Sequence, residues 1–308
     1  MHITIDATGS DVSAWAQALR LTARDEEIHV FQSATLGRVF GSAGLDFALG
    51  HTDVFHASPL TPCAPRRAKL TASIEDLSCW LMPDLHTPAE IKTAELFAEK
   101  ILAKADGLIA VSEAARRDAM PILGLPPEKI TVIYPGVDDA FFDAPPALRE
   151  RPYVLCIGSP EPRGNFTTLL SAWNGLPPEI SGAYDLVTLD SLDGLTSSDL
   201  PGLVAGATLF AHLPFHTYFA LPVAQAMAAQ VPVVISDTSG LPEVGRDAGI
   251  MVNPHEVSGI VDALARLLGS ESERAKFARY GRARAEKYRW EKCAADSLAF
   301  FHRVVGHG

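Results

Sequence analysis

The chain has 308 residues, 47% of them hydrophobic, and a formal net charge of −11 at pH 7. This length fits two domains of about 150 residues, and the acidic balance argues against nucleic acid as the main partner. No apolar run reaches the roughly 18 residues of a membrane span, and the first ten residues are typical of a strand, not a signal peptide. We therefore expect a cytoplasmic protein. The four cysteines are scattered without a CxxC pair, which argues against a zinc site or a disulfide framework.

The charge is distributed unevenly along the chain. Residues 266–303 hold ten basic and five acidic side chains. This basic stretch would allow peripheral contact with anionic lipid headgroups at the inner membrane face. A solvated helix face explains the same pattern, and it is the interpretation that we favour.

The first half alternates predicted strands and helices. Thr87 and Pro88 mark a helix start, as an N-cap residue and a proline in the first turn. Ser112 is predicted to cap the next helix, over 113–123. The predicted strands are 2–6, 28–31, 54–57, 70–74, 107–111 and 129–133, and the predicted helices begin at 12, 87 and 113.

Three prolines and mixed charges interrupt this alternation, and they predict a linker at 144–152. Strand and helix patterns then resume. Strands are expected at 153–157, 185–189, 209–213, 231–235 and 249–252, and helices at 166–173, 198–204, from 221, and three times between 253 and 305.

Alternating strands and helices predict an α/β fold with parallel, doubly wound sheets. We expect two Rossmann-like domains, at 1–143 and 153–288, whose parallel sheets face across an interdomain cleft. The last helix, 289–308, is expected to pack back on the first domain through Trp290, Phe300 and Phe301.

One stretch, 209–237, has the pattern of a phosphate-binding unit. A short apolar strand is followed by a loop, then by a helix that begins at Leu221-Pro222, then by the β-branched strand 231–235. A loop that leads into a helix N-terminus at the carboxyl end of a parallel sheet is a common anion site. An ordinary crossover without a ligand has the same pattern.

The chain resembles the retaining glycosyltransferases of family 4 (group 1), which have the GT-B fold, over nearly its whole length. The pieces that carry this resemblance are DVFH (53–56), EDLS (75–78), ADGLIAVSE (105–113), LPPEKITV (125–132), YPGVD (134–138), GSPEPR (158–163) with Asn165, Phe219 with LP (221–222), AMA (226–228), VPVVISD (231–237) and LPEV (241–244).

The resemblance implies transfer of a sugar, with retention, from a nucleoside-diphosphate sugar to a glycan or lipid-linked acceptor, as in polysaccharide assembly. The donor would bind the C-terminal domain and the acceptor the N-terminal domain. No protein-bound metal and no cofactor besides the substrate are implied. The implied catalytic positions are Thr217, Glu75 and Asp76, and the implied donor-binding positions are Gly9, Ser159, Arg163, Phe219, Ala220, Leu221, Pro222 and Gln225.

Several of these positions depart from the family pattern. Thr217 and Gln225 replace two glutamates that ordinarily contact the donor sugar and the nucleotide ribose. Gln225 keeps one acceptor oxygen but loses the charge that strengthens each hydrogen bond. Gly164 stands where a lysine usually meets the diphosphate, although the neighbouring Arg163 would substitute. Glu75 replaces a histidine, and a carboxylate there would repel a diphosphate unless it is protonated or paired.

These departures leave two hypotheses. The first is an active transferase with altered donor handling. The alternative is a catalytically degenerate family member that acts as a binding or regulatory partner of an active glycosyltransferase. A nicotinamide dehydrogenase is excluded, because no GxGxxG follows the strands at 3–6 or 154–157.

Three histidines have simple structural interpretations. His56 is expected to be a semi-buried, hydrogen-bonded residue. His212 and His216 lie close together in sequence, but no Cys or acidic residue accompanies them as a metal ligand would. We expect both to be surface or cleft histidines.

Overall fold

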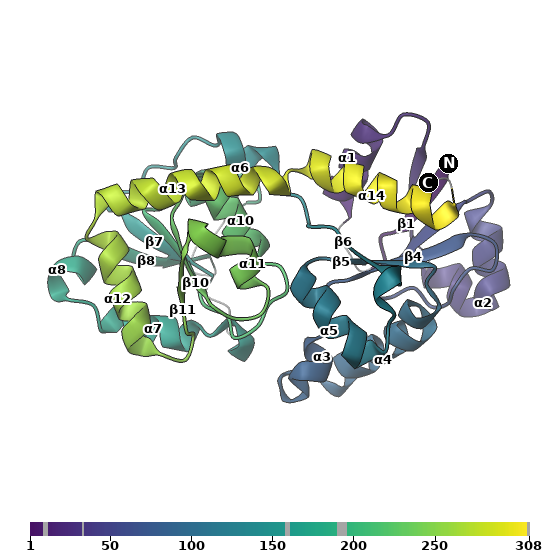
Figure 1. Cartoon of the computed structure of the whole chain (residues 1–308), viewed down its shortest axis with the longest axis horizontal. Helices are drawn as coiled ribbons and strands as arrows, with labels where there is room; N and C mark the ends of the chain where they lie inside the picture. Colours follow the sequence, from purple (N-terminus) through teal and green to yellow (C-terminus); the bar gives the residue numbers. More distant parts are fainter. Residues whose placement is uncertain (9–11, 33, 158–160, 190–195, 307–308) are drawn as a thin grey trace. The chain divides into compact units, whose positions relative to one another are not determined.

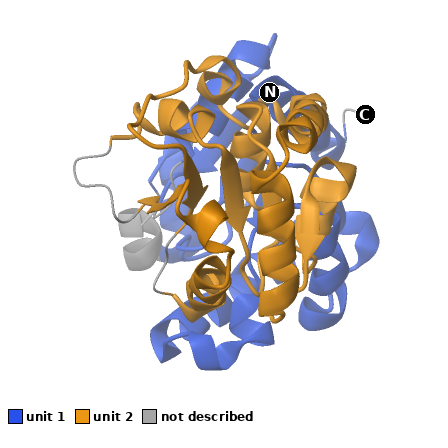
Figure 2. Ribbon diagram, turned by 90° about the vertical axis from the view of Figure 1, so that its left-hand side faces the viewer, with its two compact units in different colours: residues 1–136, 290–308 blue, residues 137–289 orange. Residues whose placement is uncertain are grey.

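The computed structural model describes residues 1–8, 12–32, 34–157, 161–189 and 196–306. It divides the chain into two compact units (Figures 1 and 2). Unit 1 consists of Met1–Gly136 and Trp290–Gly308, and unit 2 of Val137–Arg289. Each unit contains one sheet in which all described strand pairs are parallel. The predicted α/β class is therefore confirmed.

The sheet of unit 1 has the strand order β2-β1-β3-β4-β5-β6. Its strands are β1 (His2–Asp6), β2 (Glu27–Phe31), β3 (Val54–Ala57), β4 (Lys69–Ile74), β5 (Gly107–Ala110) and β6 (Ile130–Val132). Its helices are α1 (Ser13–Thr22), α2 (Ala34–Leu49), α3 (Ser78–Leu81), α4 (Pro88–Lys100), α5 (Glu113–Leu123) and α14 (Trp290–Val305), with 3-10 turns η1 (Pro83–Leu85), η2 (Leu102–Lys104) and η3 (Pro127–Lys129).

Two helices of unit 1 begin where their capping residues predict. At the start of α4, Thr87 accepts a hydrogen bond from the Glu90 backbone N–H and Glu90 reaches back to Thr87, which forms a capping box. At the start of α5, the Ala115 N–H donates to Ser112 Oγ (3.0 Å). Gly124 ends α5 in the left-handed conformation that glycine adopts without strain.

The C-terminal helix α14 is part of unit 1 and packs along α1. Phe300 and Phe301 are buried in the core with Ile3 and Ile5 of β1. A Cβ added to Gly136 would lie 2.1 Å from the Trp290 ring, so the glycine permits the close approach of this ring. The expected docking of the last helix through its aromatic side chains is therefore present.

The sheet of unit 2 has the strand order β11-β10-β9-β7-β8. Its strands are β7 (Tyr153–Cys156), β8 (Asp185–Thr188), β9 (Leu209–His212), β10 (Val233–Ser236) and β11 (Ile250–Val252). Its helices are α6 (Asp139–Asp143), α7 (Phe166–Asn174), α8 (Pro178–Ser181), α9 (Leu200–Ala205), α10 (Leu221–Ala228), α11 (Leu241–Gly245), α12 (Val257–Leu268) and α13 (Glu271–Ala285), with 3-10 turns η4 (Pro162–Gly164), η6 (Arg246–Ala248) and η7 (Glu286–Tyr288).

The boundary between the units differs from the predicted linker at 144–152, which lies inside unit 2. The Ala147 N–H donates to the Gly202 carbonyl (2.8 Å), which joins this segment to α9. The preceding helix α6 contacts α13, because the Arg282 guanidinium of α13 lies 4.7 Å from the Phe142 ring centroid of α6. A proline-rich segment can thus be extended and still packed, which its composition does not reveal.

The helix α2 was not predicted, because its glycines lower helix propensity. The structure accommodates one of them by a kink at Gly41, where φ is +60°. The segment therefore forms two helical pieces that meet at this residue.

Much of the basic stretch 266–303 is engaged within the chain. Arg266 pairs with Glu273, and Arg284 donates to the Glu243 and Val244 carbonyls at the end of α11. Arg289 pairs with Asp139 and Glu286. Among the described residues, no helix has both the length and the apolar run required to cross a bilayer.

Candidate functional site

Each sheet has one point at which the strand order reverses. In unit 1, β1 lies between β2 and β3, and in unit 2, β7 lies between β8 and β9. The carboxyl ends of the strands at such a point diverge into loops, and ligands of open α/β sheets bind there. These two places are where the candidate site residues must be sought.

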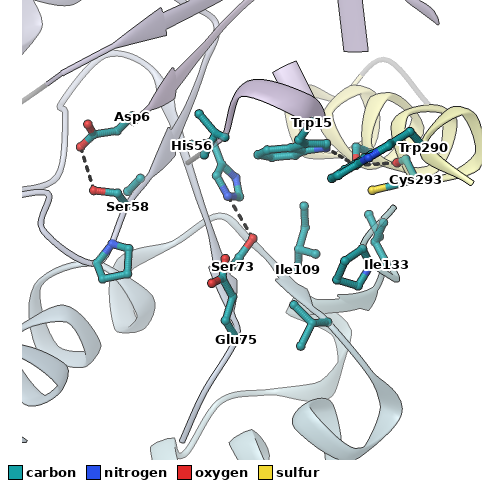
Figure 3. Close-up of a pocket in the computed structure, with 16 residues that line it drawn as sticks. Asp6, Trp15, His56, Ser58, Ser73, Glu75, Ile109, Ile133, Trp290 and Cys293 are labelled. Carbon is teal, nitrogen blue, oxygen red and sulfur yellow. Dashed lines mark hydrogen bonds between the residues drawn. The ribbon is translucent and has the colours of Figure 1, made fainter. Parts of the chain in front are cut away.

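In unit 1, a cavity of about 160 Å³ opens at this point (Figure 3). Strands, loops and α14 all contribute to its wall. Its lining includes Asp6, Trp15, His56, Ser58, Ser73, Glu75, Ile109, Ile133, Trp290, Cys293 and Ser297.

Asp6 ends β1 and is 1% exposed. Its Oδ1 accepts hydrogen bonds from the Thr8 N–H (2.9 Å) and hydroxyl (2.6 Å). Its Oδ2 accepts from the hydroxyls of Ser58 (3.2 Å) and Thr61 (2.5 Å). A buried carboxylate requires such partners, so Asp6 fixes the loops that follow β1 and β3 around the cavity.

His56, in β3, is buried between two hydroxyl groups. Its Nδ1 lies 3.1 Å from Thr71 Oγ1. Its Nε2 lies 3.1 Å from Ser73 Oγ, and Figure 3 shows this second contact as a dashed line. Desolvation lowers the pKa of His56 to about 3, although the Asp6 charge acts in the opposite direction. The imidazole is therefore neutral at pH 7. The expected hydrogen-bonded histidine is present, but it is fully buried where a semi-buried one was expected.

Glu75 and Asp76 directly follow β4, and they have different surroundings. Glu75 lines the cavity, and its pKa is raised by desolvation first and by the neighbouring Asp76 charge second. The side chain remains exposed, so the carboxyl group is accessible at the cavity wall. Asp76 Oδ1 accepts the Ser78 N–H (2.8 Å), which begins α3. Of the two predicted catalytic carboxyl groups, only Glu75 lines this cavity.

The wall opposite Glu75 is largely aromatic. Trp15 and Trp290 both line it, and Trp15 Nε1 donates to Ser297 Oγ (3.2 Å). Burial raises the pKa of the Cys293 thiol to about 12, so this sulfur is protonated and is a poor nucleophile. Flat aromatic faces beside polar groups match the two kinds of surface of a sugar ring.

A second, mostly apolar groove shares Pro59, Ser73 and Glu75 with this cavity. It runs between α3 and α4, and its walls include Leu77, Trp80 and Phe97. Glu75 therefore lies where the cavity and the groove meet.

In unit 2, the loops that follow β7 and β9 meet at the point of reversal. The Phe215 N–H donates to the Arg163 carbonyl (2.9 Å). Asn165 is 5% exposed and has a left-handed φ of +55°. Its Nδ2 donates to the Leu213 and Pro254 carbonyls, each at 2.9 Å. Asn165 thus has a structural role, holding the β7–α7 loop to the loops after β9 and β11.

The loop after β10 contains hydroxyl groups that lack partners. Thr238 Oγ1 and Ser239 Oγ are buried and have no hydrogen-bond partner within the described part of the chain. Ser239 also has a positive φ of +55°, a costly conformation for a serine. The Gly240 N–H donates to the Thr217 carbonyl (2.9 Å), which brings this loop to Thr217. Buried hydroxyls of this kind require a partner from outside the protein chain, such as a water molecule or a ligand.

The helix α10 begins at the predicted Leu221-Pro222 and has no side-chain cap. Ala220 is buried, and its carbonyl accepts the Val223 N–H (3.0 Å). Leu221, Pro222 and Gln225 are half-buried, while most of the remaining residues of α10 are buried. Because Leu221 and Gln225 are four residues apart, they lie on the same accessible face.

Two further donor positions have defined contacts. Arg163 donates from Nε to Glu161 Oε1 (2.8 Å), so its charge is already paired with a carboxylate. Phe219 lies edge-on to Tyr288, with ring centroids 5.4 Å apart. Gly9 and Ser159 lie outside the described residues.

His212 and His216, which were expected to be surface or cleft histidines, are both half-buried. Burial lowers the pKa of His212 to about 4, so it is neutral at pH 7. Its ring lies 6.3 Å from that of Phe210. His216 lies edge-on to Tyr218 at 4.6 Å, and its Nδ1 is buried. Both therefore have one part in contact with neighbouring aromatic rings and another part accessible to solvent.

Sequence reasoning missed Asp6, Ser73, Trp15, Thr238 and Ser239. Asp6 and Ser73 lie at or near strand ends, a position that hints at function only once the strand order is known. The unpaired hydroxyls of Thr238 and Ser239 have no sequence signal, because an unpaired state is a property of three-dimensional contacts.

Comparisons with known proteins identify the family and the fold. The family model "Glycosyltransferase Family 4" matches residues 14–141, and the model "Glycosyl transferases group 1" matches residues 189–284. O-antigen chain mannosyltransferase B of Escherichia coli is 26% identical over 281 residues, covering 80% of this chain and 74% of that protein. MMP alpha-(1->4)-mannosyltransferase of Mycolicibacterium hassiacum is 29% identical over 223 residues, covering 64% of this chain and 54% of that protein.

Solved structures share the fold over nearly the whole chain. Sucrose-phosphate synthase from Thermosynechococcus elongatus has a TM-score of 0.77 at 14% identity and covers 100% of both chains. Anabaena Alr3699/HepE, solved in complex with UDP-glucose, has a TM-score of 0.70 at 17% identity and covers 97% of this chain and 99% of that one. At these identities the likeness shows the fold alone, which is GT-B.

Proposed function

Because the chain belongs to the family-4 glycosyltransferases and has the GT-B fold, we propose that it transfers a sugar, with retention, from a nucleoside-diphosphate sugar to a glycan or lipid-linked acceptor. The observation that carries this proposal is the convergence of three loops at the carboxyl edge of the unit 2 sheet. Two buried, unpaired hydroxyls lie in one of these loops.

The donor is proposed to bind unit 2 along these loops. Thr238 and Ser239 would donate hydroxyl hydrogen bonds to phosphate or sugar oxygens. The N-terminus of α10 would favour the diphosphate through its partial positive charge. Gln225 would accept one hydrogen bond from the ribose, and Thr217 would contact the sugar without contributing charge. Arg163 would meet the diphosphate only if it exchanged its Glu161 partner for a phosphate oxygen.

Stabilising the departing diphosphate is the main electrostatic contribution that this arrangement offers. As the bond between the anomeric carbon and the diphosphate oxygen breaks, negative charge accumulates on that oxygen. Fixed N–H and O–H donors stabilise this charge without reorganisation. Thr217 and Gln225 replace the two glutamates of the family pattern. The positive charge that develops on the sugar as the bond breaks would therefore be stabilised less than in that pattern.

The acceptor is proposed to bind the cavity of unit 1. Trp15 and Trp290 would contact the apolar face of a sugar, and Ser73 and Glu75 would hydrogen-bond its hydroxyls. Neutral His56 orients Ser73 without placing a charge in the cavity.

Calorimetry with UDP, GDP and their sugars tests the donor half of this proposal. We expect binding with roughly micromolar to millimolar dissociation constants. Ser239→Ala should weaken binding about tenfold or more, because it removes a hydrogen bond to a charged group. Ser258→Ala, which changes an exposed serine on α12, is the matched control. Absence of binding by every nucleotide, together with new binding by a Thr217→Glu, Gln225→Glu, Gly164→Lys variant, would instead support the degenerate alternative.

Peripheral contact with an anionic membrane is a further part of the proposal. Lys276, Arg279 and Lys287 are exposed on α13 and η7 and would carry it. Sedimentation with anionic vesicles should decrease when these three are changed to glutamate. Sedimentation that is unchanged in this variant would count against membrane contact through these helices.

A further inference from the structure

A cluster of three metal-ligating side chains lies at the start of the first two strands of unit 1. His2 of β1 is the register partner of Glu27 of β2, and His29 follows Glu27 by two residues. Residues two apart on a strand face the same side of the sheet. The cluster lies at the amino end of the sheet, whereas the acceptor cavity lies at the carboxyl end.

The distances in this cluster match those between ligands of one ion. His2 Nδ1 lies 3.2 Å from Glu27 Oε2, and His29 Nε2 lies 3.6 Å from the same oxygen. All three ligand atoms lie within 4.8 Å of one another. Tetrahedral zinc with bonds of about 2.0–2.2 Å separates its ligand atoms by about 3.3–3.6 Å.

Hydrogen bonding alone does not explain this arrangement. A separation of 3.6 Å is too long for a hydrogen bond between His29 and Glu27. Two imidazole nitrogens nevertheless converge on one carboxylate oxygen. A shared cation would explain both separations. The side chains of His2, Glu27 and His29 are 32%, 65% and 60% exposed, so they can make the small movement that binding a cation requires.

The backbone holds the ligands in place. The Glu27 N–H donates to the Met1 carbonyl (2.9 Å), and the His2 N–H donates to Asp53 Oδ2 (2.8 Å). His51 packs edge-on against the His2 ring at 4.7 Å. The first contact belongs to the β1–β2 pairing, which sets the spacing of the three ligands, and the other two hold His2 against the segment before β3.

We propose that His2, Glu27 and His29 bind a divalent transition metal ion of the zinc class, with water at the remaining coordination positions. Two imidazoles and one carboxylate are ligands that suit zinc. The ion would tie β2, which is an edge strand, to β1. It would stabilise unit 1 and take no part in sugar transfer.

Titration of the full, EDTA-treated chain with zinc chloride by calorimetry tests this proposal. We expect one equivalent of zinc to bind. His29→Ala and Glu27→Gln should each weaken binding at least about tenfold. His255→Ala, which removes an exposed histidine of unit 2, should bind zinc as the native chain does.

Thermal unfolding provides a second measurement that does not depend on sugar transfer. Zinc should raise the unfolding midpoint of the native chain by a few degrees, and it should leave that of His29→Ala unchanged. Because His29 is exposed, this variant should fold, which circular dichroism can verify. Equal zinc affinity in the native chain and His29→Ala, or no stoichiometric binding by the native chain, would overturn the proposal.

Discussion

Desolvation shifts the pKa values of three residues around the unit 1 cavity. It keeps His56 neutral, keeps the Cys293 thiol protonated, and raises the pKa of Glu75. The cavity therefore presents neutral hydrogen-bonding groups and two carboxyl groups, Glu75 and the buried Asp6, and both oxygens of Asp6 already accept hydrogen bonds. Such a surface suits a polyhydroxylated acceptor better than a charged one.

His56 should make the chain sensitive to acid. Its pKa is about 3 when folded and about 6.5 when unfolded, so only the unfolded chain gains a proton as the pH falls below 6.5. The stabilising contribution is therefore complete at pH 7 and is lost towards pH 3. Between pH 7 and pH 5 the free energy of unfolding should fall by about 2 kcal/mol through this residue. Urea unfolding of the native chain and His56→Gln at both pH values measures the difference. Equal losses in the two proteins would contradict this account.

Glu75 should matter for the acceptor and not for the donor. Glu75→Gln should lower kcat/KM for the acceptor by about 10- to 100-fold, because it removes a hydrogen bond to a charged group. Since the pKa of Glu75 is raised, the native rate should increase as the pH rises through a value above 4.5, and Glu75→Gln should lack this dependence. Donor affinity, measured by calorimetry, should not change. An Asp76→Asn variant provides the comparison, because Asp76 accepts the Ser78 N–H at the start of α3 and does not line the cavity.

At the residue scale the sequence predicted the Leu221-Pro222 helix start, which is confirmed, and pointed to Glu75, which lines the cavity of unit 1. It did not reveal that Arg163 is paired with Glu161 or that Asp76 accepts a backbone hydrogen bond. These facts depend on side-chain partners, and a pattern of residue types does not specify partners.

At the element scale, the loop that ends in Gly240 depends on close backbone packing. A Cβ at Gly240 would lie 1.9 Å from the Tyr218 carbonyl oxygen. The Cβ would be fixed to the Gly240 backbone, and the oxygen belongs to the Tyr218 backbone. This clash can therefore be relieved only if the loops that carry Thr217 and Ser239 shift.

Gly240→Ala should therefore destabilise the fold and reduce donor binding. Overpacking of this kind costs about 1–3 kcal/mol. Gly259→Ala in α12 is the matched control, because the nearest atom to its added Cβ is 4.0 Å away. Alanine has the higher helix propensity, so this control should be neutral or slightly more stable. Urea unfolding compares the two variants, and a Gly240→Ala protein as stable as Gly259→Ala would refute the packing argument.

Most strands and helices could be predicted because their capping residues and hydrophobic patterns favour the same elements that the fold contains. The capping box of Thr87, the Ser112 cap and the β-branched strand of β10 each point to the observed element. The kinked helix α2 could not be predicted, because packing overrides the low propensity of its glycines.

At the scale of the whole molecule, the two-unit organisation follows from the repeated alternation of strands and helices. The exact boundary does not follow, because Ala147 and Phe142 are held by contacts with α9 and α13 that the sequence does not display. Each unit has a parallel sheet with one reversal of strand order, and each reversal lies beside candidate site residues.

The most direct test of the account is a transfer assay with the full chain. Incubation with a panel of UDP- and GDP-sugars and glycan or lipid-linked acceptors, followed by NMR of the product, reports both activity and stereochemistry. We predict release of a nucleoside diphosphate and a glycoside whose anomeric configuration matches that of the donor, with both lowered in Ser239→Ala. A folded chain that yields an inverted product, or that binds nucleotide but transfers sugar to none of these acceptors, would contradict the account.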